Sequence, residues 1–88
     1  MIDLSKYVAN QEDLEFLEEI RSALSADFLN EVHLLYKDKH LSIEPTEGRI
    51  IVFYLGQSYE FETIDEVFLN FFLDGKAFIE KVSELAYE

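Results

Sequence analysis

The stretch from Arg49 to Leu55 most constrains the fold of this chain. It reads Arg-Ile-Ile-Val-Phe-Tyr-Leu, is apolar on both alternating faces, and lies between Gly48 and Gly56. A short apolar run that is rich in β-branched and aromatic residues, and is bounded by turn residues, predicts a β-strand covered on both faces. We therefore expect this strand to occupy a central place in a sheet.

Residues 58–62 read Ser-Tyr-Glu-Phe-Glu and alternate between aromatic and acidic side chains. This period of two predicts a strand with Tyr59 and Phe61 toward the core and with Glu60 and Glu62 toward water. The glycine ahead of this segment is expected to form the turn that joins it to the central strand.

The segment that precedes the central strand is ambiguous in type. The apolar residues of 26–37 fit both a helix and a strand. We favour a strand over 31–36 and keep, as the alternative, a second helix that starts at Ser25. A polar turn over 37–39, followed by alternation over 41–43, predicts a hairpin.

A break in the pattern follows at residues 44–48. Pro45 lacks a donor N–H, and Gly48 adopts a positive φ without steric cost. We expect a tight connection there. The central part of the chain thus predicts a small antiparallel meander of three to four strands.

Helical periodicity marks residues 11–24, whose apolar side chains recur on one arc of a helix. Asn10 is placed to cap the first turn. Four acidic residues occupy the opposite face: Glu12, Glu15, Glu18 and Glu19. Because like charges one turn apart weaken an isolated helix, this face is suboptimal for the helix alone.

Two further helices are predicted in the C-terminal part. Thr63 and Glu66 match the capping box for a helix that begins at Ile64. Gly75 suits the left-handed position that ends a helix. From Lys76 onward, apolar residues again recur at helical spacing and predict a last helix.

The first of these two helices is apolar nearly all round. Leu69 and Leu73 point away from its main apolar stripe, so both of its sides need cover. We expect the last helix to fold back and supply that cover. The functional alternative is that Leu69 and Leu73 form a dimer or partner surface.

The composition requires a folded chain. Although the net charge is -12, the sequence is 49% hydrophobic and contains eight Phe and five Tyr, unlike a disordered segment. We interpret residues 1–88 as a single α+β domain: an N-terminal amphipathic helix, the meander, and two C-terminal helices packed on the sheet. Without cysteine, the chain has neither disulfides nor a thiolate nucleophile.

The sequence also bounds location and partners. There is no apolar signal segment at the start and no long uncharged apolar stretch, so we expect a cytoplasmic protein without membrane association. The negative charge repels phosphate backbones, so we expect no direct nucleic-acid partner.

His33 and His40 are the only histidines. They approach each other across the predicted hairpin only if its register permits, and a metal site would need a third ligand such as Asp38 or Glu31. We interpret both as surface histidines and expect no metal site, no cofactor and no catalytic residue. A small metal-dependent enzyme built on this pair is kept as an alternative.

The charge pattern predicts a small, acidic, non-enzymatic protein that binds a basic protein partner or associates with itself as a homodimer. The candidate interaction surface comprises Glu12, Glu15, Glu18, Glu19, Glu60, Glu62, Leu69 and Leu73. The alternative is an immunity or antitoxin-type inhibitor, or a nucleic-acid mimic, that neutralises a cationic enzyme. The chain shares with such proteins only its size, its charge and its lack of catalytic motifs.

Overall fold

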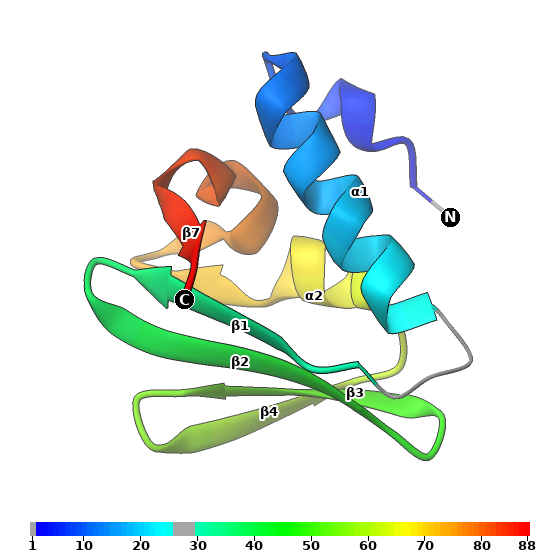
Figure 1. Ribbon diagram of the computed structural model, residues 1–88, viewed down its shortest axis with the longest axis vertical. Coiled ribbons are helices and arrows are strands. Elements are labelled where there is room, and N and C mark those ends of the chain that lie inside the picture. The colour runs from blue at the N-terminus through cyan, green and yellow to red at the C-terminus, as the bar shows by residue number, and fades with distance from the viewer. Residues whose placement is uncertain (1, 26–29) are drawn as a thin grey trace.

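The computed structural model describes residues 2–25 and 30–88 and shows an α+β fold, as predicted (Figure 1). One long helix, a five-stranded antiparallel sheet and a shorter helix form its main parts. The elements, with 3₁₀ turns written η, are η1 (Leu4–Lys6), α1 (Gln11–Ser25), β1 (Val32–Tyr36), β2 (Lys39–Thr46), β3 (Arg49–Tyr54), β4 (Gln57–Phe61), α2 (Ile64–Asn70), β5 (Phe72–Leu73), β6 (Lys76–Ala77), η2 (Phe78–Glu80), η3 (Val82–Glu84) and β7 (Leu85–Tyr87).

The sheet has the strand order β4-β3-β2-β1-β7, and all of its neighbouring strands are antiparallel. Two-residue turns join the four consecutive strands, and a fourth such turn joins β5 to β6. Both residues of every turn have positive φ, as in the type I′ turns that suit the twist of a hairpin. These pairs are Lys37-Asp38, Glu47-Gly48, Leu55-Gly56 and Asp74-Gly75.

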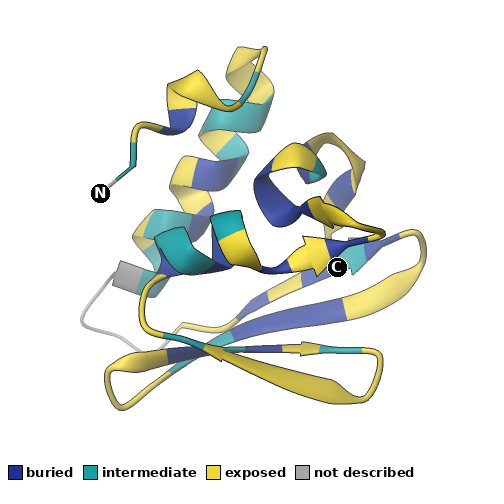
Figure 2. Cartoon of the chain, turned by 180° about the vertical axis from the view of Figure 1, so that it is seen from behind, coloured by how far each residue is buried: buried dark blue, intermediate teal, exposed yellow. Residues whose placement is uncertain are grey.

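Both helices lie on one face of the sheet, α1 over β1 and α2 over β3 and β4 (Figure 1). Buried residues gather where the helices meet the sheet, whereas the hairpin tips are exposed (Figure 2). Leu17 and Ile20 of α1 and Phe68 of α2 are fully buried there. On that face the strands contribute alternate residues, as their period of two requires. In the described part of the chain, no helix is long and apolar enough to cross a membrane.

The predicted N-terminal ends of the helices α1 and α2 are confirmed. The Asn10 side-chain oxygen accepts a hydrogen bond from Asp13 N–H at 2.8 Å, and Thr63 Oγ1 accepts one from Glu66 N–H at 3.2 Å. The Glu66 carboxylate reaches one residue further than the capping box predicts, because it accepts from Glu62 N–H at 3.0 Å. These caps satisfy backbone N–H groups that have no partner within the helix.

The strand that was favoured over 31–36 is confirmed as β1, while residues 26–29, on which part of the alternative helix falls, lie outside the described residues. The expected strand over 41–43 is longer, because β2 includes Pro45 and only Glu47-Gly48 forms the turn. Pro45 lies beyond Ile43, the last residue of β2 that pairs with β1. β2 is an edge there, where a missing N–H is tolerated.

The strand predicted over residues 49–55 is confirmed as β3, which lies inside the sheet between β4 and β2, although β2 has the middle position. The prediction that both faces of β3 are covered is wrong. The inward residues Ile50 and Val52 are buried, but on the other face Ile51 is half-buried and Phe53 is 40% exposed. Among the described residues, no helix packs on this outer face. The apolar character of both sides of β3 therefore marks an open sheet face.

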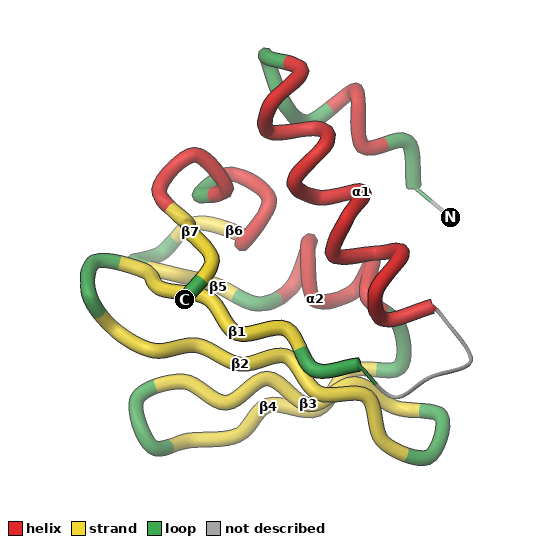
Figure 3. Tube along the Cα trace, viewed as in Figure 1, coloured by secondary structure: helices red, strands yellow, loops and turns green. Residues whose placement is uncertain are grey.

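The prediction of a second C-terminal helix is also wrong. From Lys76 the chain forms the strand β6, two 3₁₀ turns and then β7, which pairs with β1 (Figure 3). Gly75 lies in the hairpin turn and does not cap a helix. The apolar spacing that suggested a helix arises because Phe78, Ile79 and Val82 are buried by the 3₁₀ turns. β7 forms backbone hydrogen bonds with the edge of β1. A helix in this place would leave those backbone groups of β1 without partners.

Asp74 fastens the β5–β6 hairpin to the turn between β1 and β2. The buried Tyr36 hydroxyl donates to Asp74 Oδ2 at 2.7 Å, and Lys37 Nζ donates to the same oxygen at 3.0 Å. The hydrogen bond from Tyr36 and the neighbouring Lys37 charge hold the pKa of Asp74 below its ordinary value. This contact holds the start of the C-terminal segment close to the strand with which its end pairs.

We predict that Leu55→Asn raises the free energy of unfolding by about 1 kcal/mol. Leu55 has φ 51° at a hairpin tip and is 63% exposed, so it is strained and gains little from packing. Asparagine tolerates this conformation, whereas Leu55→Val, with its branched Cβ, should lower stability. Urea unfolding of the parent chain, Leu55→Asn and Leu55→Val measures both effects. A loss of stability with asparagine would show that the leucine side chain makes stabilising contacts.

Candidate functional site

The four glutamates of α1 all lie on its exposed side, as expected for the face opposite the core. Among the described residues, none of Glu12, Glu15, Glu18 and Glu19 forms an ion pair with Lys, Arg or His. Glu15, Glu18 and Glu19 border a shallow depression together with Ser22. The result is a concentrated negative surface over two helical turns, which we call the acidic face (Glu12, Glu15, Glu18, Glu19).

An aromatic pair adjoins the acidic face. The rings of Phe16 on α1 and Tyr87 on β7 lie 4.9 Å apart between their centres. The Tyr87 hydroxyl donates to Glu19 Oε2 at 3.0 Å, and 49% of Tyr87 is exposed. Burial, followed by this hydrogen bond and the charge of Glu19, raises the pKa of Tyr87 to about 12. The acidic face thus borders an aromatic side chain that offers both apolar area and a polar tip.

The other predicted acids lie at the opposite end of the sheet. Glu60 is exposed on β4, and its carboxylate accepts a hydrogen bond from Arg49 at 3.1 Å. Glu62 follows the end of β4 and is exposed beside Glu66, at a shallow depression that Arg49 and Glu60 also border. This group includes a cation, so its negative charge is partly neutralised.

Leu73 takes no part in the surface of the chain, because it is only 1% exposed. Leu69 is half-buried and packs against the core. The chain is extended from Phe71 onward, so Phe71 and Leu73 face inward and Phe72, 58% exposed, faces outward. The dimer surface proposed for Leu69 and Leu73 therefore lacks one of its two residues.

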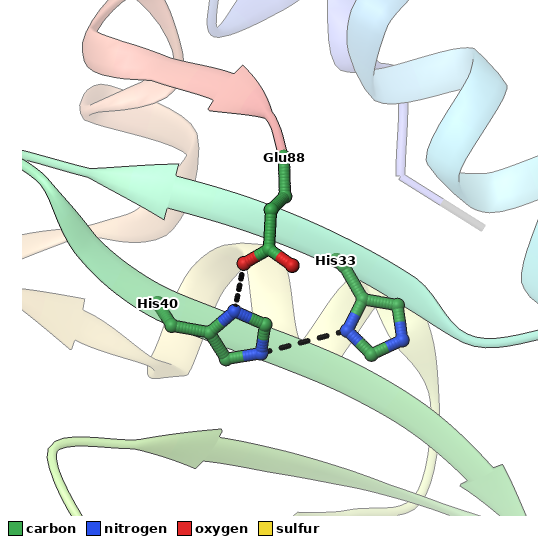
Figure 4. A group of neighbouring side chains, drawn as sticks. All are labelled: His33, His40 and Glu88. Atoms are coloured by element: carbon green, nitrogen blue, oxygen red, sulfur yellow. Dashed lines mark hydrogen bonds and ion pairs between the residues drawn. The ribbon is translucent and has the colours of Figure 1, made fainter.

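The hairpin register brings the two histidines together on the open face of the sheet (Figure 4). His33 pairs with Ser42 and His40 with Leu35, so the imidazoles are diagonal neighbours on β1 and β2. Their ring centres lie 5.4 Å apart, and His33 Nδ1 is 3.5 Å from His40 Nε2. The Glu88 carboxylate, at the end of β7, contacts His40 Nδ1. These three side chains, which we call the histidine cluster (His33, His40, Glu88), are all exposed.

A second carboxylate contacts the other imidazole. Glu31 Oε2 lies 3.1 Å from His33 Nε2, so each histidine has one ring nitrogen against a carboxylate and the other facing its neighbour. Ser42 lies on the same sheet face and is 4% exposed, but its hydroxyl donates to Glu44 at 3.1 Å. Ser42 makes no hydrogen bond to either imidazole among the described residues, so the cluster offers imidazole nitrogens and carboxylate oxygens.

His33, His40 and Glu31 are recognisable in the sequence, but no site was expected from them. The missing residue is Glu88, which the backbone places beside His33: Glu88 N–H donates to the His33 carbonyl oxygen at 3.1 Å. No local pattern indicates this contact, because it depends on the pairing of β7 with β1. The exposed Tyr87 was missed as a neighbour of the acidic face for the same reason.

Comparisons with protein-family models, curated proteins and solved structures found none that matches this chain. Functional inference therefore rests on its own side chains. They form two separate groups on opposite faces of the sheet: the acidic face with Tyr87, and the histidine cluster.

We predict that Tyr87→Phe reduces stability below pH 10 and that the difference from the parent chain shrinks as the pH rises toward 12. The folded chain holds the Tyr87 phenol neutral above its ordinary pKa of 10.0. The contribution of the neutral phenol to stability is therefore complete below pH 10.0 and is lost as the pH rises through about 12. Urea unfolding at about pH 9 and about pH 11.5 measures it.

Tyr7→Phe is the matched control, since Tyr7 is exposed and has no side-chain hydrogen bond within the described residues. An equal difference between the parent chain and Tyr87→Phe at both pH values would contradict the contact with Glu19.

Proposed function

We propose that this protein is a non-enzymatic interaction module that binds a basic protein through the acidic face of α1 and the adjoining Tyr87. The observation that carries this proposal is the lack of any ion pair for the four glutamates within the described residues. Four like charges on one helix face cost helix stability, so they are better explained by a partner than by the fold.

Tyr87 supplies what the carboxylates lack. Charged groups at an interface raise the association rate and select the partner, while aromatic side chains contribute more of the binding energy. Tyr87 is half-exposed and held by Phe16 and Glu19, so it loses little conformational freedom when a partner binds. A basic surface with an apolar or cationic group opposite Tyr87 fits this arrangement.

The test begins with the immobilised chain in native lysate at about 50 mM and about 0.5 M salt, followed by identification of the bound proteins. The affinity of the purified partner is then measured for the parent chain and for two double variants. Glu15→Gln with Glu18→Gln alters the acidic face. Asp38→Asn with Glu47→Gln removes the same charge from exposed hairpin turns.

We expect the helix variant to lose about tenfold in affinity and the control to stay within about twofold. Affinity should also fall as salt rises. Equal losses in both variants would mean that net charge alone matters, and salt-independent binding would contradict the proposal. If the partner is a nucleic-acid enzyme that the chain inhibits, the protein is an immunity or antitoxin-type inhibitor, the alternative drawn from the sequence.

A further inference from the structure

We propose that His33 and His40 bind one divalent transition-metal ion, of the zinc, nickel or copper class, on the open face of the sheet. The inference is independent of the proposed partner surface, because the two sites share no residue. The proposal rests on the distance between the two imidazoles, on the carboxylates that contact them, and on the strands that hold the two histidines.

The distance between the facing nitrogens suits a metal ion. A tetrahedral ion bound at about 2.0–2.1 Å from each of two imidazole nitrogens holds those nitrogens about 3.4 Å apart. His33 Nδ1 and His40 Nε2 are 3.5 Å apart, which is close to this spacing. Each imidazole side chain is close to half exposed, at 43% and 48%, which leaves a path for the ion and room for water molecules to serve as the third and fourth ligands.

The outer carboxylates determine where the imidazole protons lie. Glu31 accepts from His33 Nε2–H and Glu88 accepts from His40 Nδ1–H when both rings are neutral. The facing nitrogens, His33 Nδ1 and His40 Nε2, then both carry lone pairs. Two lone pairs at this distance repel each other, and a proton or a metal ion between them relieves the repulsion. Carboxylates on the outer N–H groups are also the usual second layer of a histidine metal site.

The strands hold the ligands in place before any ion binds. His33 and His40 lie on β1 and β2, which pair over five residues of each strand. Glu88 is held beside His33 by its backbone hydrogen bond at 3.1 Å. Only side-chain rotation is needed for binding, so the ordering cost is small.

Imidazole ligands set the class of ion. Nitrogen ligands favour zinc, nickel and copper, whereas magnesium and calcium prefer oxygen. The acidic face offers only oxygen ligands and would bind any divalent cation weakly. Binding that persists in excess Mg²⁺ and requires the imidazoles is therefore specific to the histidine cluster.

The test is a calorimetric titration of the metal-free chain with ZnCl₂ in excess Mg²⁺. We expect one Zn²⁺ per chain, and an affinity at least about thirtyfold lower in His33→Gln and in His40→Gln. Glu88→Gln should lower it about tenfold, because the acceptor for His40 N–H is weakened. Glu15→Gln with Glu18→Gln, which alters only the acidic face, should leave it within about twofold.

Nuclear magnetic resonance of the parent chain gives a readout that does not depend on whether the variants fold. Since the chain has two histidines, its imidazole spectrum contains two sets of signals, and both should shift together at one equivalent of Zn²⁺. Unmoved imidazole signals, or a Zn²⁺ affinity that is equal in His33→Gln and the parent chain, would overturn the proposal.

Discussion

The pairing of β7 with β1 is the interaction on which the rest of this structure depends. It joins Leu85–Tyr87 to Leu34–Tyr36 at the edge of the hairpin, and the middle pair, Leu35 and Ala86, is 51 positions apart in the chain. Non-local pairing costs loop-closure entropy, which further contacts of the intervening chain offset. These are the type I′ turn at Asp74-Gly75, the bond from Tyr36 to Asp74, and the stacked rings of Phe68 and Phe78, 5.6 Å apart.

The same pairing builds both candidate sites. Successive residues of a strand point to opposite faces, so Tyr87 faces the helices while Glu88, next along the chain, faces the open side. Tyr87 thereby reaches Phe16 and Glu19, and Glu88 reaches His40. β7 thus connects the acidic face, the proposed protein-binding surface, to the histidine cluster on the other face of the sheet. A change that detached β7 would remove one member of each site.

The sequence predicted what local physical chemistry decides. The cap at Asn10 and the cap at Thr63 each depend on residues a few positions apart, and both were confirmed. The strand over 58–62 was confirmed as β4, but Tyr59, which was expected to face the core, is 38% exposed. The segment from Lys76 was not predictable in this way, because its apolar spacing suits a helix as well as 3₁₀ turns and a strand. The open face was missed because an apolar strand reads alike whether its second face is covered or exposed. Glu88 could be placed only from the register of β7.

The most direct test of this account is the backbone nuclear magnetic resonance spectrum over residues 76–88. We expect extended chemical shifts at 85–87, close contacts between Leu35 and Ala86 across the strands, and slow hydrogen exchange at Glu88 N–H, which donates to the His33 carbonyl. Continuous helical shifts from Lys76 to Ala86, without contacts to β1, would contradict it. They would separate Tyr87 and Glu88 from the sites to which they are assigned.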